Sequence, residues 1–159
     1  METAKNFKGF TLIELLVGIT ITSIVFSVGY SGFREFSRRQ ALTGVTKTVV
    51  ADLRQIQQLA LTGQKPSTCS AQKLIGYTFA RVDQDTYTLT ANCTGNINTV
   101  TKTVDLNGVT FTATAVSTLF KILGQGTSLA ADNNLVFTHI ATGTTGTVTI
   151  RVGGDVQVQ

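Results

Sequence analysis

A single carboxylate, that of Glu14, lies inside a long apolar stretch near the N-terminus of this 159-residue chain. Between Phe10 and Phe33 it is the only charged residue. A charge within a bilayer costs about 2.5–3.5 kcal/mol on insertion scales, and such residues usually have a functional partner. We therefore expect Glu14 to act through an ionic contact rather than through catalysis.

Cys69 and Cys93 are the next residues that could do chemistry, and both follow the apolar stretch. If that stretch is a membrane anchor and the rest of the chain is exported, a disulfide between them would persist. On the loop-entropy model it would stabilise the fold by about 3–4 kcal/mol. The alternative is a pair of free thiols in a reducing compartment.

The remaining candidates do not form a recognisable site. His139 is the only histidine, and its apolar context favours a place on the surface of a strand over a catalytic role. One histidine and two cysteines make no convincing zinc set, and nothing marks a nucleophile. The glycine-rich stretch Gly124–Ser128 lacks the lysine of a phosphate-binding loop. The sequence therefore predicts a protein that is not an enzyme and needs no metal or cofactor.

The segment that holds Glu14 is long enough to cross a membrane. As a helix, residues 10–33 would extend about 36 Å, which exceeds the ~30 Å hydrocarbon core. A short polar leader, residues 1–9, precedes it and carries Lys5 and Lys8. A basic leader followed by an apolar run is typical of an export signal.

Two simple interpretations of this segment are a secretory peptide cut after Ser27-Val28-Gly29 and a plain single-span anchor. Neither accounts for Glu14 or for Gly9. The sequence KGFTLIELL, which begins at Lys8, resembles the N-terminal signature of type IV prepilins and type II secretion pseudopilins. In that family a prepilin peptidase, which is also a methyltransferase, cuts after the glycine at the cytoplasmic face of the membrane and methylates the new N-terminus.

The resemblance implies a role for each residue of the signature. Gly9 would end the leader, and Phe10 would be the first, N-methylated residue of the mature chain. Glu14 would meet the N-terminal amine of a neighbouring subunit in the fibre. Because a buried charge is costly alone but tolerated when paired, docking would remove a penalty that the unassembled subunit carries. The pairing would also favour the correct axial register.

Beyond Phe33 the chain becomes polar without a helix breaker. Apolar residues recur every three or four positions, which predicts an amphipathic helix over residues 34–63 with one buried face. Gly63, followed by Pro66, predicts its end. With the anchor this makes one helix from Phe10 to Thr62, about 80 Å long. The apolar residues of the buried face are Leu42, Val45, Val49, Leu53, Ile56 and Ala60.

After Pro66 the pattern changes to a period of two, so residues 64–159 are predicted to form a β-rich domain. A long helix followed only by strands indicates an α+β fold, in which the helix packs on an antiparallel sheet as in type IV pilins. The predicted strands are Leu74–Ala80, Thr86–Ala91, Val100–Leu106, Val109–Ala115, Leu119–Leu123, Asn134–Thr138, Thr147–Val152 and Val156–Val158.

Two glycine turns predict the register of neighbouring strands. Asn107-Gly108 is typical of a two-residue hairpin, which would pair Leu106 with Val109 and Val104 with Phe111. Gly153-Gly154 predicts a second hairpin. A three-residue loop through Asp155, which pairs Val152 with Val156 and Ile150 with Val158, is preferred there to a two-residue loop.

The β-rich region gives a looser resemblance, to the H-type minor pseudopilins of type II secretion and the T-type fimbrial minor pilins. Its stretches are residues 75–93 and 134–158. This resemblance implies a minor structural subunit of a pilus or secretion fibre, with other pilin or pseudopilin subunits as partners. Some members of that branch bind DNA during transformation through a basic C-terminal tail. Here the tail holds Arg151 alone, with Asp155 close by, and so departs from that basic pattern. DNA binding is therefore kept only as the alternative function.

The charge pattern gives conflicting signals about orientation in the membrane. The chain has 13 Lys+Arg against 9 Asp+Glu, a mild excess of +4. Arg34, Arg38 and Arg39 follow the anchor and oppose the usual preference for cytoplasmic positive charge. The prepilin-like signature decides in favour of a single-pass protein of the cytoplasmic membrane, with its leader inside and its β-rich domain outside.

Overall fold

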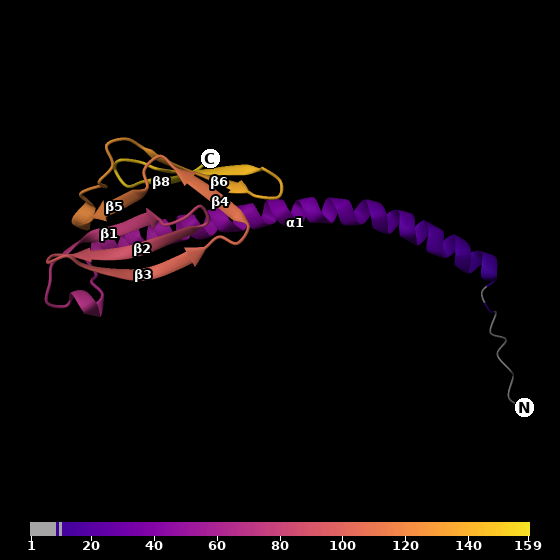
Figure 1. Cartoon of the computed structure of the whole chain (residues 1–159), viewed down its shortest axis with the longest axis horizontal. Coiled ribbons are helices and arrows are strands. Elements are labelled where there is room, and N and C mark those ends of the chain that lie inside the picture. The colour runs from indigo at the N-terminus through magenta and orange to yellow at the C-terminus, as the bar shows by residue number, and fades with distance from the viewer. Residues whose placement is uncertain (1–8, 10) are drawn as a thin grey trace, which may run out of the picture. The chain divides into compact units, whose positions relative to one another are not determined.

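The computed structural model describes Gly9 and residues 11–159, without the side chains of residues 28, 29 and 31. The leader residues 1–8 and Phe10, where the helix was expected to begin, lie outside the described residues. The chain divides into two compact units, one ending at Ser37 and the other comprising Arg38–Gln159. Helix α1, Leu12–Thr62, contributes to both units (Figure 1).

In the first unit, α1 is apolar on all sides as far as Phe33, apart from Glu14. Its large side chains are exposed, as for Leu12 and Phe26, which are 83% and 74% exposed. Its hydroxyl groups donate hydrogen bonds to carbonyls of the preceding turn, as from Thr22 to Gly18 and from Ser27 to Ser23. Within the part that the structure describes, α1 is long and apolar enough to cross a membrane. Its surface therefore suits lipid or neighbouring apolar helices.

In the second unit, one face of α1 is buried, as the spacing of the apolar residues predicts. Val49 and Leu53 are fully buried, Leu42, Ile56 and Ala60 are nearly so, and Val45 packs at the margin of the core. The predicted end is also confirmed. Gly63 has φ 66° and donates to the carbonyl of Ala60, while Gln64 donates to that of Leu59. This double hydrogen bond is the Schellman motif, which satisfies the last carbonyls of a helix.

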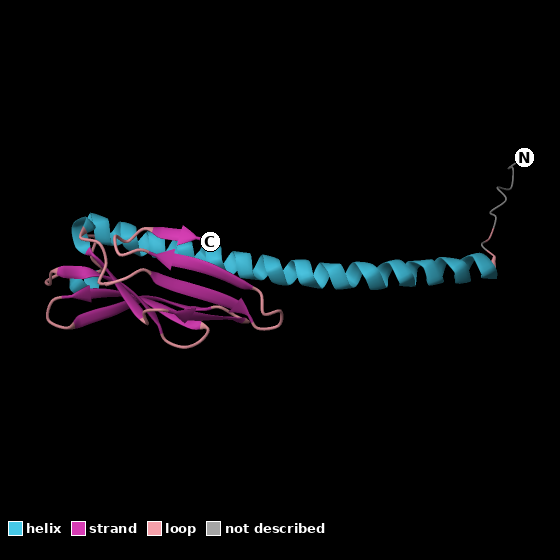
Figure 2. Cartoon of the chain, turned by 90° about the horizontal axis from the view of Figure 1, so that it is seen from above, coloured by secondary structure: helices cyan, strands magenta, loops and turns pink. Residues whose placement is uncertain are grey.

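The β-rich part contains two four-stranded antiparallel sheets rather than one. Figure 2 shows both sheets in magenta beside the second half of α1. Short 3-10 turns, η1 (Ser67–Cys69) and η2 (Ile122–Gly124), lie between elements. The first sheet, in the order β3-β2-β1-β5, contains β1 (Leu74–Arg81), β2 (Thr86–Cys93), β3 (Ile97–Asp105) and β5 (Ser117–Lys121). The second, in the order β4-β6-β7-β8, contains β4 (Val109–Ala113), β6 (Asn133–His139), β7 (Thr145–Ile150) and β8 (Val156–Val158).

Four aromatic rings join the two sheets. Phe79 and Tyr87 come from the first sheet, and their ring centroids lie 5.0 Å apart. Phe111 and Phe137 come from the second and stack at 5.3 Å. The ring of Phe111 also lies 6.3 Å from those of Phe79 and Tyr87. Aromatic pairs at these separations stabilise a core beyond the area that they bury.

The predicted hairpin at Asn107-Gly108 is wrong. Both residues have positive φ, 37° and 84°, as the local turn chemistry requires. The turn nevertheless carries the chain from one sheet to the other, because β3 pairs with β2 and β4 pairs with β6. Pairing with β6 places Phe111 opposite Phe137, and thus between the sheets. Core packing, and not the turn, decides this pairing.

The predicted register of the last hairpin is wrong by two residues. Ile150 pairs with Val156, and Val148 pairs with Val158. The turn closes earlier because Gly154, at φ 95°, donates to the carbonyl of Arg151. A shift of two residues leaves the same side chains on the core face, so alternation alone does not distinguish the two registers.

Two polar or covalent links fasten the elements of the second unit. Cys69 and Cys93 form a buried disulfide between η1 and the end of β2, so the free-thiol alternative does not hold in the structure. Asp52 of α1 is also buried and accepts hydrogen bonds from the Tyr87 hydroxyl at 2.7 Å and from Lys102 Nζ at 2.7 and 2.8 Å. Burial, and secondarily the hydrogen bond and charge of Asp52, raise the pKa of Tyr87 far above its usual value, so its hydroxyl remains a donor.

A substitution at Gly76 can test the close approach of β1 and β5. A Cβ at this position would collide with the carbonyl oxygen of Phe120, a backbone atom that cannot rotate away. We expect Gly76→Ala to lower the free energy of unfolding by about 1–3 kcal/mol, as overpacking typically does. Chemical denaturation of the full chain in detergent measures this change.

Gly153→Ala is the matched control, since a Cβ there would meet no atom within 4 Å. It should change the free energy of unfolding by less than about 0.5 kcal/mol. Equal effects of the two substitutions would contradict the close contact between β1 and β5.

Candidate processing and assembly site

Thr11 directly precedes α1 and caps its N-terminus. Its Oγ1 accepts a hydrogen bond from the backbone N–H of Glu14 at 3.3 Å, and its carbonyl accepts one from Leu15 at 3.2 Å. The sequence Thr-x-x-Glu is the pattern of a capping box, which satisfies the free N–H groups of a first turn. Sequence reasoning missed this role of Thr11, although the pattern was there to be read.

The cap places Glu14 at the third position of α1, in its first turn. Its carboxylate is exposed among exposed apolar side chains, including Ile13 and Leu15. The positive end of the helix dipole favours a carboxylate here by about 0.3–1 kcal/mol. Among the described residues no side chain of opposite charge pairs with Glu14. The dipole thus offsets only part of the cost of placing this charge in an apolar medium.

Small residues lie beside Glu14 on the same helix face. Gly18 and Thr22 follow at intervals of four residues, and a Cβ at Gly18 would meet no atom within 4 Å. These residues and Glu14 line a shallow apolar hollow in the helix surface. A neighbouring chain could therefore approach close to the carboxylate.

Comparison with family models identifies this region. The prokaryotic N-terminal methylation motif matches residues 4–30, which include Gly9, Thr11 and Glu14. This motif is the leader signature of type IV prepilins and pseudopilins, and the match is confined to this N-terminal segment. Comparisons with curated proteins and with solved structures gave no match. The motif does not distinguish the branches of the family, so the likeness to H-type pseudopilins and T-type minor pilins stays a prediction.

The prepilin motif and the fold agree with one another. The long helix packs through its second half on antiparallel β-structure, which is a type IV pilin-like α+β architecture. The motif implies processing by prepilin peptidase and assembly with other pilins. Gly9 is exposed and precedes the cap, whereas the bond between Gly9 and Phe10 includes a residue outside the described part.

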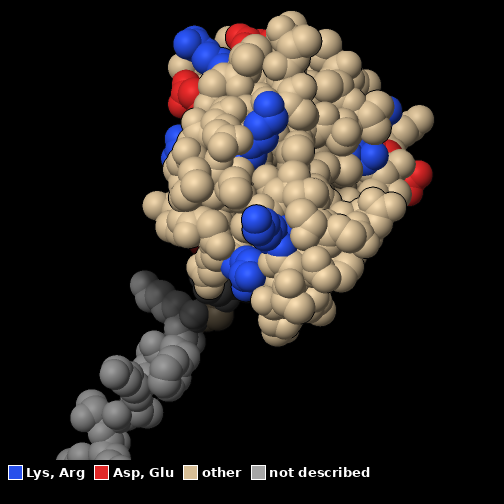
Figure 3. Space-filling model, turned by 90° about the vertical axis from the view of Figure 1, so that its left-hand side faces the viewer, with Lys and Arg blue, Asp and Glu red and all other residues tan. Residues whose placement is uncertain are grey.

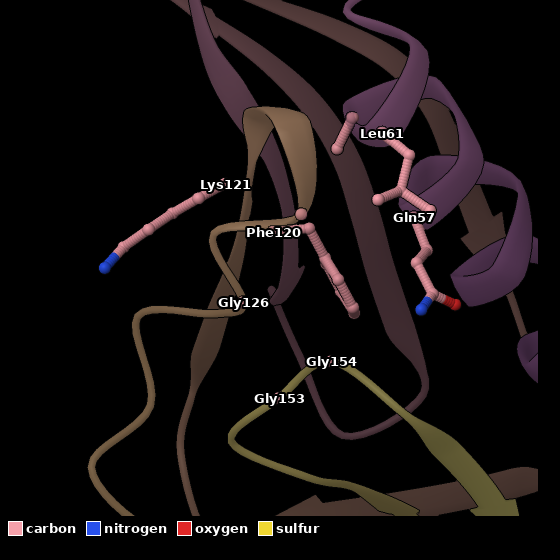
Figure 4. A pocket seen from close by; sticks show the side chains of 9 residues that line it. Gln57, Leu61, Phe120, Lys121, Gly126, Gly153 and Gly154 are labelled. Carbon is pink, nitrogen blue, oxygen red and sulfur yellow. The ribbon is translucent and has the colours of Figure 1, made fainter.

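No second site stands out among the described residues of the β-domain. His139 lies at the end of β6, where its Nδ1 accepts a hydrogen bond from the N–H of Ala141, so it helps to close a turn. Among the described residues, no group of three His, Cys, Asp or Glu side chains could hold a metal ion. Figure 4 shows a small hollow lined by Phe120, Gln57 and several glycines, and the Lys121 side chain points away from it.

The charges of the β-domain do not gather into one continuous patch on the face that Figure 3 shows. Blue Lys and Arg atoms stand there in separate small groups, some beside red acidic atoms. Near the C-terminus the guanidinium of Arg151 donates to Gln157, and Gln157 in turn donates to Asp155. A polyanion such as DNA needs several adjacent phosphate contacts, which this face does not offer as a track.

Proposed function

We propose that this chain is a minor structural subunit of a type IV pilus or a type II secretion pseudopilus. The peptidase cuts the prepilin between Gly9 and Phe10 and methylates the Phe10 amine. The processed subunit then remains in the cytoplasmic membrane until it is added to a fibre. The observation that carries the proposal is the prepilin motif with its single carboxylate, Glu14, at the start of an apolar helix.

Ion pairing explains how one residue can guide assembly. After cleavage, Phe10 has a free amine, four residues before Glu14 in the sequence. An amine and a carboxylate that remain unpaired in the membrane each carry a desolvation cost. When Glu14 of an incoming subunit meets the Phe10 amine of a subunit already in the fibre, both costs fall. The contact therefore favours one axial offset between neighbouring helices.

The exported location of the β-domain completes the proposal. Disulfides form and persist in oxidising compartments, and Cys69–Cys93 links two segments of this domain. We assign the leader to the cytoplasm and the β-domain to the outer side, with one membrane crossing between them. The minor role rests on the looser likeness of the β-rich region alone. DNA binding stays outside the proposal because no feature of the described charges favours it.

The processing step predicts a defined mature mass. Intact-mass and peptide spectrometry of the protein from its native host should show a chain that begins at Phe10 with one added methyl group. Gly9→Val should leave the leader in place, because the peptidase recognises the glycine before the cut. Gly18→Val, farther along the helix, is the control and should be processed normally. An unprocessed native chain that starts at Met1 would contradict the proposal.

The assembly step predicts a specific loss in Glu14→Gln. This variant has the same shape and polarity but no charge, so membrane insertion and cleavage should persist. Its amount in fibres sheared from cells should fall at least about tenfold, the effect of losing roughly 1.4 kcal/mol. Quantitative blotting of membrane and fibre fractions separates the two steps.

Glu35→Gln is the matched control, since Glu35 lies on α1 beyond the apolar run. It should enter fibres at wild-type levels. Wild-type incorporation of Glu14→Gln would show that the carboxylate does not guide assembly.

A further inference from the structure

Strand β3 is the outer strand of the first sheet, and its free edge could pair with another chain. Among the described strands it pairs only with β2. Near its start, Thr99 Oγ1 lies 2.8 Å from Thr68 Oγ1 of η1, so this part is covered. The rest of the strand, from Val100 onward, is largely exposed. A long exposed edge is a ready template for strand addition by a second copy.

A β-bulge interrupts this edge at Thr101. Val100 pairs with Thr90 and Lys102 pairs with Leu89, so Thr101 is an extra residue in β3. Its Oγ1 donates to the carbonyl of Leu89. Ile97 and Val104 are seven residues apart, and strict alternation would place them on opposite faces. The bulge brings both to the core side, where they pack against it.

The same bulge turns Lys102 inward, toward the helix. Leu89, its partner, is buried, and Lys102 Nζ bonds both carboxylate oxygens of Asp52. The Lys102 side chain is 43% exposed, whereas that of Asp52 is 7% exposed. The ammonium group thus keeps part of its hydration on the open side, at the sheet edge.

We infer that the Thr101 bulge and the inward Lys102 prevent β3 from pairing with β3 of a second copy. A strand added at this edge would remove the remaining water from the ammonium group and bury the ion pair fully, which costs several kcal/mol per ion. The bulge also breaks the regular ladder of N–H and C=O groups that an added strand needs. This protection of the β3 edge goes beyond the proposed fibre function. Its effect is greatest where copies of the chain are crowded together.

The test removes the bulge and the polar cluster around Lys102 from the full chain, which is purified in detergent. Deleting Thr101 restores a regular ladder and leaves Lys102 facing inward. The triple variant Asp52→Leu, Tyr87→Phe and Lys102→Val replaces the polar cluster with apolar groups, an exchange that is often neutral for stability. A variant that carries both the Thr101 deletion and the three substitutions should dimerise at least about tenfold more tightly than wild type, as measured by light scattering. Its β3 amides should gain protection in hydrogen exchange.

Lys47→Val is the control for the loss of an exposed lysine in the same unit, and it should match wild type. If the triple variant fails to fold, Asp52→Asn with Lys102→Met keeps a hydrogen-bond acceptor for Tyr87 and gives the same test. A folded, uncharged and bulge-free variant that stays monomeric, with unchanged exchange in β3, would overturn the inference. The readout is independent of fibre assembly, so failure of the fibre proposal would leave this result interpretable.

Discussion

The cost of placing the Glu14 carboxylate in an apolar helix is the constraint on which the rest of the account depends. Glu14 sits in the first turn of α1, and its surroundings are exposed apolar side chains. The helix dipole stabilises the carboxylate in part, by about 0.3–1 kcal/mol. That is less than the insertion cost of such a charge. In the proposed fibre, the remainder would favour a state in which a neighbouring subunit supplies the cation.

The second half of α1 has a different role, because it packs against the β-domain. Its buried face contributes apolar residues to the core, and Asp52 adds a charged link to β2 and β3. A buried ion pair is weak evidence for stability but can specify one arrangement among several. Here the ion pair between Asp52 and Lys102 sets the position of α1 along its own axis relative to β3. The disulfide and the glycine-enforced approach of β1 and β5 then constrain the end of the domain at which α1 stops.

Much of this architecture could be predicted because local pattern determines it. The 3.6-residue period of α1, its stop at Gly63 and all eight strand positions follow from spacing and turn residues. Strand pairing could not, because Asn107-Gly108 forms the same local turn whether it joins neighbours in a sheet or two sheets. The start of β3 was missed by three residues, since the bulge at Thr101 disrupts alternation. The odd spacing of Ile97 and Val104 is the signal that could have revealed it.

Among the functional and structural clusters, contiguous motifs could likewise be predicted from the sequence, whereas clusters assembled by folding could not. The motif around Gly9 and Glu14 was readable because it is a contiguous signature, and the capping box of Thr11 was readable but overlooked. The Asp52–Tyr87–Lys102 cluster was not readable, since its members lie 35 and 50 residues apart and meet only in the folded domain.

The most direct measurement is the distance between the Glu14 carboxylate and the Phe10 amine of different subunits within a fibre. Solid-state NMR on fibres grown from a mixture of ¹³C-labelled and ¹⁵N-labelled subunits reports only contacts between copies. The account predicts a cross-signal between the Glu14 carboxyl carbon and the methylated Phe10 nitrogen, corresponding to a separation of about 4 Å or less. Well-ordered mixed fibres in which this signal is absent would contradict it.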